Sequence, residues 1–193
     1  GIVEAASWEP GAFALLDAIR EDEGAALLAA CHSFGVMCRW AGVARPVLRD
    51  PSKGGKSTGV LDNLLTPEAL RHPWFSRFAE QLRDRHRHRI VDNRVFDLIP
   101  EPHAAGDGFV PLANETRGIG GPRGEALTMM EFARDRGGLM PRIFGANHHP
   151  EIVDRSRQLM ILRQKLERGD VTQDWYDERH QILTKTYPDE DSD

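Results

Sequence analysis

The sequence predicts an α/β fold around a mostly parallel sheet, and three observations support this prediction. Strand-like and helix-like patterns alternate along the chain. The run 25–30 is continuously apolar, as in a strand that is covered on both faces. Cys31 follows that run directly, and apolar residues then recur at helical spacing over 34–42. The order of strand, sharp turn and helix places a thiol at the carboxyl end of a strand, where α/β sheets bind ligands.

The composition limits the class of protein. The 193 residues carry 25 Lys and Arg against 30 Asp and Glu, a formal net charge of −5, which argues against a general nucleic-acid binder. No apolar run approaches the roughly 20 residues of a membrane span. No secretory signal is visible at the N-terminus and two cysteines make no disulfide framework, so we expect a cytoplasmic protein. We expect one domain over 1–187 and an acidic tail over 188–193.

The first third of the chain alternates short strands with helices. A β-prone run at 1–6 precedes an amphipathic stretch, which the polar residues 21–24 close. The elements predicted here are a strand at 1–6, a helix at 12–20, a strand at 25–30, a helix at 34–42, a strand at 46–48 and a polar loop at 50–55.

The rest of the chain continues the mixed pattern. Thr66 is a predicted N-cap with Pro67 at the first helical position, and Gly169 is a predicted residue just beyond a helix end. The basic run 83–89 alternates in a way that suits an exposed strand face. The remaining predictions are β structure at 90–99, 109–113, 125–132 and 142–145, loops at 100–108 and 117–124, and helices at 152–168 and 172–185.

Cys31 is a candidate nucleophile. A tight turn between strand and helix exposes the sulfur, and the positive end of the following helix stabilises a thiolate. The backbone N–H of His32, the next residue, is placed to hold an oxyanion. A buried, inert thiol is the alternative interpretation of Cys31, because free cysteines are among the most buried residues. Cys38 is most simply a core residue of the same helix.

His149 is the candidate base for this thiol. It follows the predicted strand 142–145, Pro150 stiffens the loop after it, and the Glu151 carboxylate can accept a hydrogen bond from the second ring N–H. His148 points to the opposite side if the segment is extended. The sequence therefore offers a Cys-His-acid arrangement, assembled from distant parts of the chain.

These residues resemble the class I glutamine amidotransferase superfamily. Gly145, His149, Pro150 and Glu151 match its G-x-Q-x-H-P-E loop in register, with Asn147 in place of Gln. The resemblance implies a flavodoxin-like three-layer sandwich and a triad of Cys31, His149 and Glu151. By the same resemblance, Ala6 and Ser7 lie where the family has an oxyanion loop, and Asn147 lies at a substrate-binding position.

The elbow around the nucleophile departs from the family pattern. Ala29, Ser33 and Gly35 replace the Gly, Gly and Gln of G-x-C-x-G-x-Q. Two alternatives therefore stay open beside a glutamine amidotransferase. The stretch 56–60 resembles the K-x-x-G-V of homoserine O-acyltransferases, and a catalytically silent binding module would retain the fold without the glutamine pocket.

The resemblance also sets expectations for length and partners. The family has about two more β-α units ahead of the strand that begins at Gly1, so we expect an N-terminal segment, or a partner that supplies it. We expect an enzyme that acts on a small-molecule amide or acyl substrate through a cysteine thioester, with no metal or organic cofactor. The expected partners are a synthase that receives ammonia or a second copy of the chain, without nucleic acid or membrane.

Overall fold

The computed structural model describes residues 6–49, 57–101, 108–115, 126–150, 152 and 154–186. The chain divides into two compact units, Gly1–His149 and Pro150–Asp193. Each unit is described by itself below. The predicted acidic tail at 188–193 and most of the predicted strand at 1–6 lie outside the described residues.

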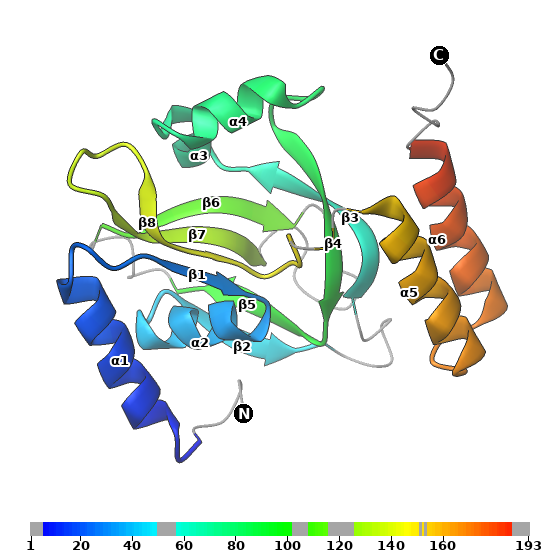
Figure 1. The fold of residues 1–193 in the computed structure, drawn as a ribbon, viewed down its shortest axis with the longest axis horizontal. Helices are drawn as coiled ribbons and strands as arrows, with labels where there is room; N and C mark the ends of the chain where they lie inside the picture. Colours follow the sequence, from blue (N-terminus) through cyan, green and yellow to red (C-terminus); the bar gives the residue numbers. More distant parts are fainter. Residues whose placement is uncertain are drawn as a thin grey trace. The chain divides into compact units, whose positions relative to one another are not determined.

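A curled, six-stranded sheet forms the centre of the first unit (Figure 1). Its strands lie in the order β1-β8-β7-β6-β3-β4, and a second sheet pairs β2 with β5. The strands are β1 (Leu27–Ala30), β2 (Ala44–Leu48), β3 (Ser57–Leu65), β4 (Arg87–Arg94), β5 (Phe96–Pro100), β6 (Val110–Glu115), β7 (Leu127–Arg134) and β8 (Pro141–Ala146).

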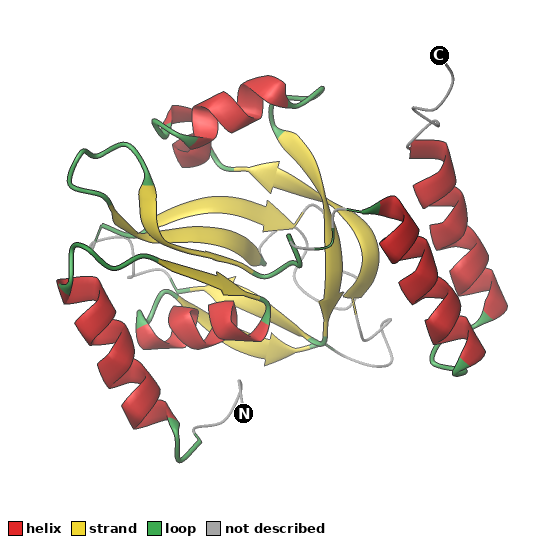
Figure 2. Cartoon of the chain, in the orientation of Figure 1, coloured by secondary structure: helices red, strands yellow, loops and turns green. Residues whose placement is uncertain are grey.

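Helices cover both faces of the six-stranded sheet, which confirms the predicted α/β class (Figure 2). One core cluster joins the sheet to α1, α2 and the second sheet and includes Leu16, Phe34 and Phe132. The other joins it to α3 and α4 and includes Ala69 and Phe75. The helices of this unit are α1 (Glu9–Glu21), α2 (His32–Trp40), α3 (Pro67–Arg71) and α4 (Phe75–Gln81).

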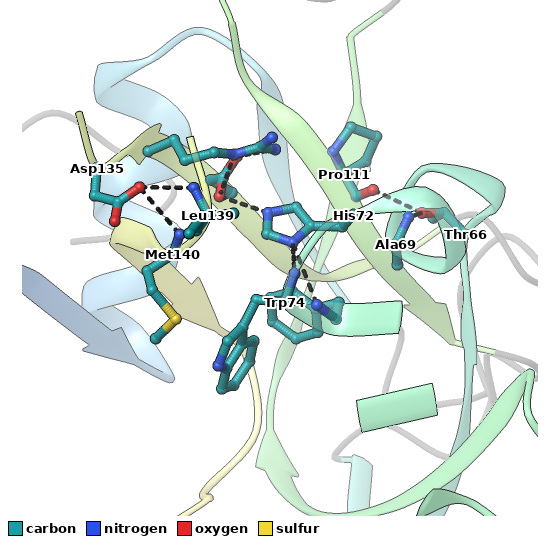
Figure 3. A network of polar contacts seen from close by, with 11 residues as sticks. Thr66, Ala69, His72, Trp74, Pro111, Asp135, Leu139 and Met140 are labelled. Atoms are coloured by element: carbon teal, nitrogen blue, oxygen red, sulfur yellow. Dashed lines mark hydrogen bonds and ion pairs between the residues drawn. The ribbon is translucent and has the colours of Figure 1, made fainter. Parts of the chain in front are cut away.

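Strand direction differs from the expected mostly parallel sheet. Only β1 and β8 run parallel among the described strand pairs, and the other pairs are antiparallel. A parallel pair requires a long crossover, whereas neighbouring antiparallel strands need only a short turn. The turn between β7 and β8 is of this short kind: one carboxylate oxygen of Asp135 accepts the N–H groups of Leu139 and Met140 at 2.8 and 3.1 Å (Figure 3).

Polar contacts hold α1 against α2. The Arg39 guanidinium donates to both oxygens of the buried Glu9 carboxylate, at 2.7 and 3.0 Å. The indole N–H of Trp40 donates to Asp17 at 2.8 Å. Charge-assisted, bidentate contacts of this type fix orientation as well as distance. They therefore set how α1 lies beside the helix that follows Cys31.

Arg142 of β8 satisfies the C-terminal end of α1. Its guanidinium donates to the backbone carbonyls of Ile19, Arg20, Asp22 and Ala25 at distances of 2.7 to 2.9 Å. The last carbonyl groups of a helix receive no hydrogen bond from an N–H group of the same helix, and they carry partial negative charge that favours a nearby cation. One side chain thus links α1, the loop after it and the strand next to β1.

The local predictions agree with the structure at several elements. Thr66 caps α3 as predicted, because its hydroxyl accepts the N–H of Ala69 at 3.1 Å. Strands were predicted close to β1, β2, β5, β6, β7 and β8, and helices close to α1, α2, α5 and α6. The sequence analysis missed β3 and α4. The predicted loops at 50–55 and 117–124, and most of the loop predicted at 100–108, lie outside the described residues.

The second unit contains two helices, α5 (Arg155–Glu167) and α6 (Gln173–Thr186). Asp154 caps α5, since its carboxylate accepts the N–H groups of Ser156 and Arg157. Gly169 follows the end of α5 with φ +70°, the left-handed conformation that was predicted for it. Among the described helices of the chain, none is long and apolar enough to cross a membrane.

Candidate active site

Cys31 lies on a strained turn between β1 and α2. Its φ of +53° is the only positive φ of a non-glycine residue in the described part of the chain. Such a conformation costs on the order of 1–3 kcal/mol and is concentrated at functional sites. The turn is fixed on one side by the N–H of Cys31, which donates to the carbonyl of Ala146 at 2.8 Å. The sequence prediction of a strand, a sharp turn and a helix is confirmed here.

His149 comes to the same edge of the sheet as Cys31. Strands β1 and β8 are parallel neighbours, with Ala30 opposite Ala146, so the residues after both strands leave at one edge. His149 lies three residues after the end of β8, is half-buried, and donates its N–H to the carbonyl of Val91 on β4 at 3.0 Å. The topology therefore brings the segments that carry the thiol and the imidazole together.

The N-terminus of α2 supplies the positive end of a dipole next to Cys31. Cys31 is the N-cap residue, and no side chain caps the helix there. The first N–H groups of an α-helix have no acceptor within the helix, and they favour negative charge. His32 and Ser33 contribute two of these groups and are both exposed. The arrangement can stabilise a thiolate or an oxyanion beside the sulfur.

Asn147 is a buried amide next to this turn. It is 0% exposed, and its backbone N–H donates to the carbonyl of Thr128 at 2.8 Å. Neither its side-chain nitrogen nor its side-chain oxygen has a hydrogen-bond partner among the described residues. A buried amide without partners costs free energy of folding, about 1–3 kcal/mol per unsatisfied group. The Asn147 amide is therefore an unsatisfied polar group that is buried next to the Cys31 turn.

Three further predicted site residues are Ala6, Ser7 and Glu151. Ala6 and Ser7 lie directly before α1, and the carbonyl of Ala6 accepts the N–H of Glu9. The oxyanion role of these two residues stays a prediction. Glu151, the predicted acid, is outside the described residues.

Cys38 is separated from this site by burial. It lies on α2 with 0% exposure, inside the core cluster of Phe34 and Phe132. Burial raises the pKa of the Cys38 thiol well above its usual value. A thiol in that state is a poor nucleophile, so Cys31 is the accessible sulfur of the pair.

Comparison with known proteins shows which solved structures have a similar fold. No family model and no curated protein matches the chain. A solved glutamine amidotransferase from Methylobacillus flagellatus matches with a TM-score of 0.53 and 13% identity, over 85% of this chain and 51% of that one. One from Thermotoga maritima matches with a TM-score of 0.55 and 12% identity, over 96% and 67%. The chain has a glutamine amidotransferase-like fold. It spans about half the length of the first of these structures.

Within this amidotransferase-like fold, the three residues that depart from the family's elbow pattern lie in different environments. Ala29, at the family's first elbow glycine, is 3% exposed and packs into the core cluster with Phe34. Ser33 lies on the first turn of α2 and is exposed, whereas Gly35 is buried within the helix. The substitution at position 33 therefore faces solvent, and position 35 offers no side chain to a substrate.

A groove of about 440 Å³ lies beside the amidotransferase-like elbow. It runs between α1, β1 and α2, and Trp8, Leu28, His32 and Ser33 are among its lining residues. Neither Cys31 nor His149 lines it. Lys56, which carries the resemblance to homoserine O-acyltransferases, lies outside the described residues.

The sequence analysis missed a buried charge cluster within the amidotransferase-like fold. Arg49 pairs with Asp97 at 2.6 Å, and Arg94 pairs with Asp92 at 2.9 Å and with Glu115. All five side chains are buried, and burial raises the pKa of Glu115 although both arginines oppose this. The pairs connect β5 of the small sheet to β4 and β6. Their signal in the sequence is the alternation of charge within the β pattern at 90–99.

A second missed feature is the buried pair of His72 and Glu131 (Figure 3). The Nε2 atom of His72 lies 2.8 Å from a Glu131 oxygen, and its Nδ1 atom accepts the N–H groups of Trp74 and Phe75 at the start of α4. Nδ1 therefore carries no proton, and Nε2 donates to the carboxylate. Arg134 holds the other carboxylate oxygen at 2.7 Å. This histidine serves the fold, since both ring nitrogens are already used.

The amidotransferase-like unit has no evident metal site in its described part. No group of three or more His, Cys, Asp or Glu side chains there could hold a metal ion. The chemistry that the described residues offer is that of a thiol, an imidazole and backbone N–H groups.

Proposed function

We propose that the chain is a cysteine-dependent amidotransferase-like enzyme that hydrolyses the carboxamide of glutamine, or of a related amide, through a thioester on Cys31. The observation that carries this proposal is the strained Cys31 turn at the end of β1, beside the parallel strand β8 that leads to His149. The fold similarity to two solved glutamine amidotransferases supports it.

The reaction would proceed in two halves. The proton of the Cys31 thiol passes to His149, and the sulfur attacks the carboxamide carbon to form the C–S bond. The N–H groups at the start of α2 stabilise the oxyanion of the tetrahedral intermediate. The intermediate then breaks its C–N bond, and His149 returns the proton to the departing ammonia. Water, deprotonated by His149, attacks the thioester and releases the carboxylic acid and the thiol.

Two further roles complete the proposed mechanism. Glu151 is proposed as the acceptor of the second His149 N–H, and Asn147 as a hydrogen-bond partner of the substrate. The buried Asn147 amide, without a partner among the described residues, supports the second role. The ammonia is proposed to pass to a synthase partner.

A glutamine-like diazoketone tests the nucleophile. We expect stoichiometric covalent labelling of the wild-type chain, located by peptide mass spectrometry, with loss of labelling in Cys31→Ala and retention in Cys38→Ala. Cys38→Ala is the matched control because that thiol lies on the same helix and is buried. Labelling that persists in Cys31→Ala and vanishes in Cys38→Ala would overturn the assignment.

Paired activity assays separate the remaining functions. Ammonia release from glutamine, abolished in Cys31→Ala and His149→Ala, is the expected result. Acyl transfer from an acyl-CoA to homoserine, without ammonia release, would instead favour the acyltransferase that the stretch 56–60 resembles. A chain with neither activity, and with a Cys31 that reacts like an ordinary thiol, would be a binding module and would overturn the proposed enzyme.

A further inference from the structure

The segment that carries His149 is held by β4 at two points. The backbone N–H of His149 donates to the carbonyl of Val91 at 3.0 Å. The ring of His148 lies edge-on to the ring of His88, with centroids 6.1 Å apart and an angle of 65° between the ring planes. His148 lies in a bend after β8 and is joined to His149 by one peptide bond, so a fixed His148 constrains the backbone that carries the His149 ring.

His88 is itself fixed by packing. It lies on β4, is 8% exposed, and contacts the ring of Phe78 of α4 edge-on, with centroids 5.7 Å apart. Phe78 in turn packs against the core cluster between the sheet and α3 and α4. A continuous row of rings therefore runs from α4 through His88 to His148.

We propose that His88 is a positioning residue for the candidate base: its ring sets the position of His148 and thereby the direction of the His149 imidazole toward Cys31. This inference rests on the proposed function. A displacement of about 1 Å in a catalytic group can reduce the rate on the order of 100-fold, which is why a buried ring next to the base-bearing segment matters.

The contact acts through shape rather than through hydrogen bonding. Neither ring nitrogen of His88 has a hydrogen-bond partner among the described residues. Burial lowers the pKa of His88 to about 4, so the ring is neutral at pH 7 although the nearby Asp62 opposes this shift. A phenyl ring of similar shape would preserve both ring contacts and would remove two unpartnered polar atoms.

The experiment compares five chains by the rate of Cys31 alkylation with iodoacetamide as a function of pH. The wild type is compared with His88→Phe, His88→Leu, His149→Ala and, as a matched control, His86→Ala, since His86 is exposed in the same basic run. We expect His88→Leu to slow alkylation near neutral pH by about 10-fold or more and to move the profile to higher pH. His88→Phe and His86→Ala should stay within about 2-fold of the wild type.

Each outcome decides between the two proposals. If the wild-type thiol reacts like an ordinary cysteine and His149→Ala leaves its profile unchanged, the proposed function fails. If the wild-type profile depends on His149 but His88→Leu leaves it unchanged, only the positioning role of His88 is overturned. A His88→Phe variant as slow as His88→Leu also overturns it, because the ring contact is then not the cause. Thermal melts of all five chains confirm that the comparison is made on folded protein.

Discussion

The ring of Phe34 occupies the space that a side chain at position 145 would need. A Cβ atom placed on Gly145 would lie 2.3 Å from Cδ2 of Phe34, a distance that forces a neighbour to move. Phe34 is 0% exposed and lies three residues after Cys31 on α2, whereas Gly145 lies on β8, four residues before His149. The glycine of the His149 loop motif therefore permits the helix after Cys31 to pack directly on the strand that leads to His149.

Gly145→Ala should destabilise the fold by about 1–3 kcal/mol, because the new methyl group overpacks a closed core. Urea denaturation measures the loss, and Phe34→Leu in the same chain should recover part of it by vacating the ring. Gly11→Ala is the matched control, since a Cβ on that helical glycine meets nothing within 4 Å. It should be neutral or stabilising by up to about 1 kcal/mol. Equal stability of Gly145→Ala and wild type would contradict the close approach.

Asn147→Leu should separate a substrate contact from a structural role. Leucine has a similar volume and removes the amide atoms that lack partners among the described residues, so the free energy of unfolding should stay the same or rise. We expect the rate of labelling by the glutamine-like diazoketone to fall about 3- to 10-fold, as for one lost hydrogen bond. Iodoacetamide, which needs no such contact, should react with Cys31 at the wild-type rate. Unchanged diazoketone labelling would remove Asn147 from the substrate site.

His72→Phe should lower the free energy of unfolding by about 2–4 kcal/mol. The variant removes the donor to the buried Glu131 carboxylate and the acceptor for the first N–H groups of α4. Urea denaturation at pH 7 gives the measurement, and His86→Phe on the exposed basic run is the control. The folded His72→Phe chain should retain the wild-type rate of Cys31 alkylation, because His72 serves the fold and not the candidate site.

His88 makes stability depend on pH. Its folded pKa of about 4 lies below the ordinary value of 6.5, so the native state binds fewer protons than the unfolded state between these values. The stabilisation is complete above pH 6.5 and is lost as the pH falls toward 4. Between pH 7 and pH 5 the wild type should lose about 2 kcal/mol more than His88→Phe, measured by urea denaturation at both pH values. The raised pKa of Glu115 acts in the opposite direction, but it is common to both chains.

An equal loss in the wild type and His88→Phe would show that the buried imidazole does not resist protonation. His88→Phe also tests the positioning role of His88. Its stability and its alkylation profile can therefore be measured on one preparation, beside the wild type.

The local chemistry of the candidate site could be predicted from the sequence because it depends on near neighbours in the chain. An apolar run that ends in Cys31 and continues as an amphipathic helix indicates an elbow without further information. Thr66 followed by Pro67 is a helix start wherever it lies. Patterns of this kind depend on a few consecutive residues, and the structure contains the turn and the helix start that they predict.

The buried polar side chains could not be predicted in the same way. His88 lies within a run of arginines that indicates an exposed strand face, and Arg87 and Arg89 beside it are half exposed. Exposed and buried side chains do alternate along β4, but only the packing of α4 decides that the other face of β4 is covered. The same holds for Asn63 and Asn147, whose burial depends on strands far apart in the sequence.

The sequence by itself determined most of the elements, the Thr66 cap and the choice of a thiol and an imidazole as the candidate chemistry, because propensity and periodicity act over a few residues. Only the tertiary structure decided that β1 is parallel to β8 while the other described strand pairs are antiparallel. It also decided that the Phe34 ring leaves no room for a side chain at Gly145 and that His88 packs against His148, next to His149. The physical reason is that strand direction and side-chain burial depend on which distant segments meet, and no local pattern records that choice.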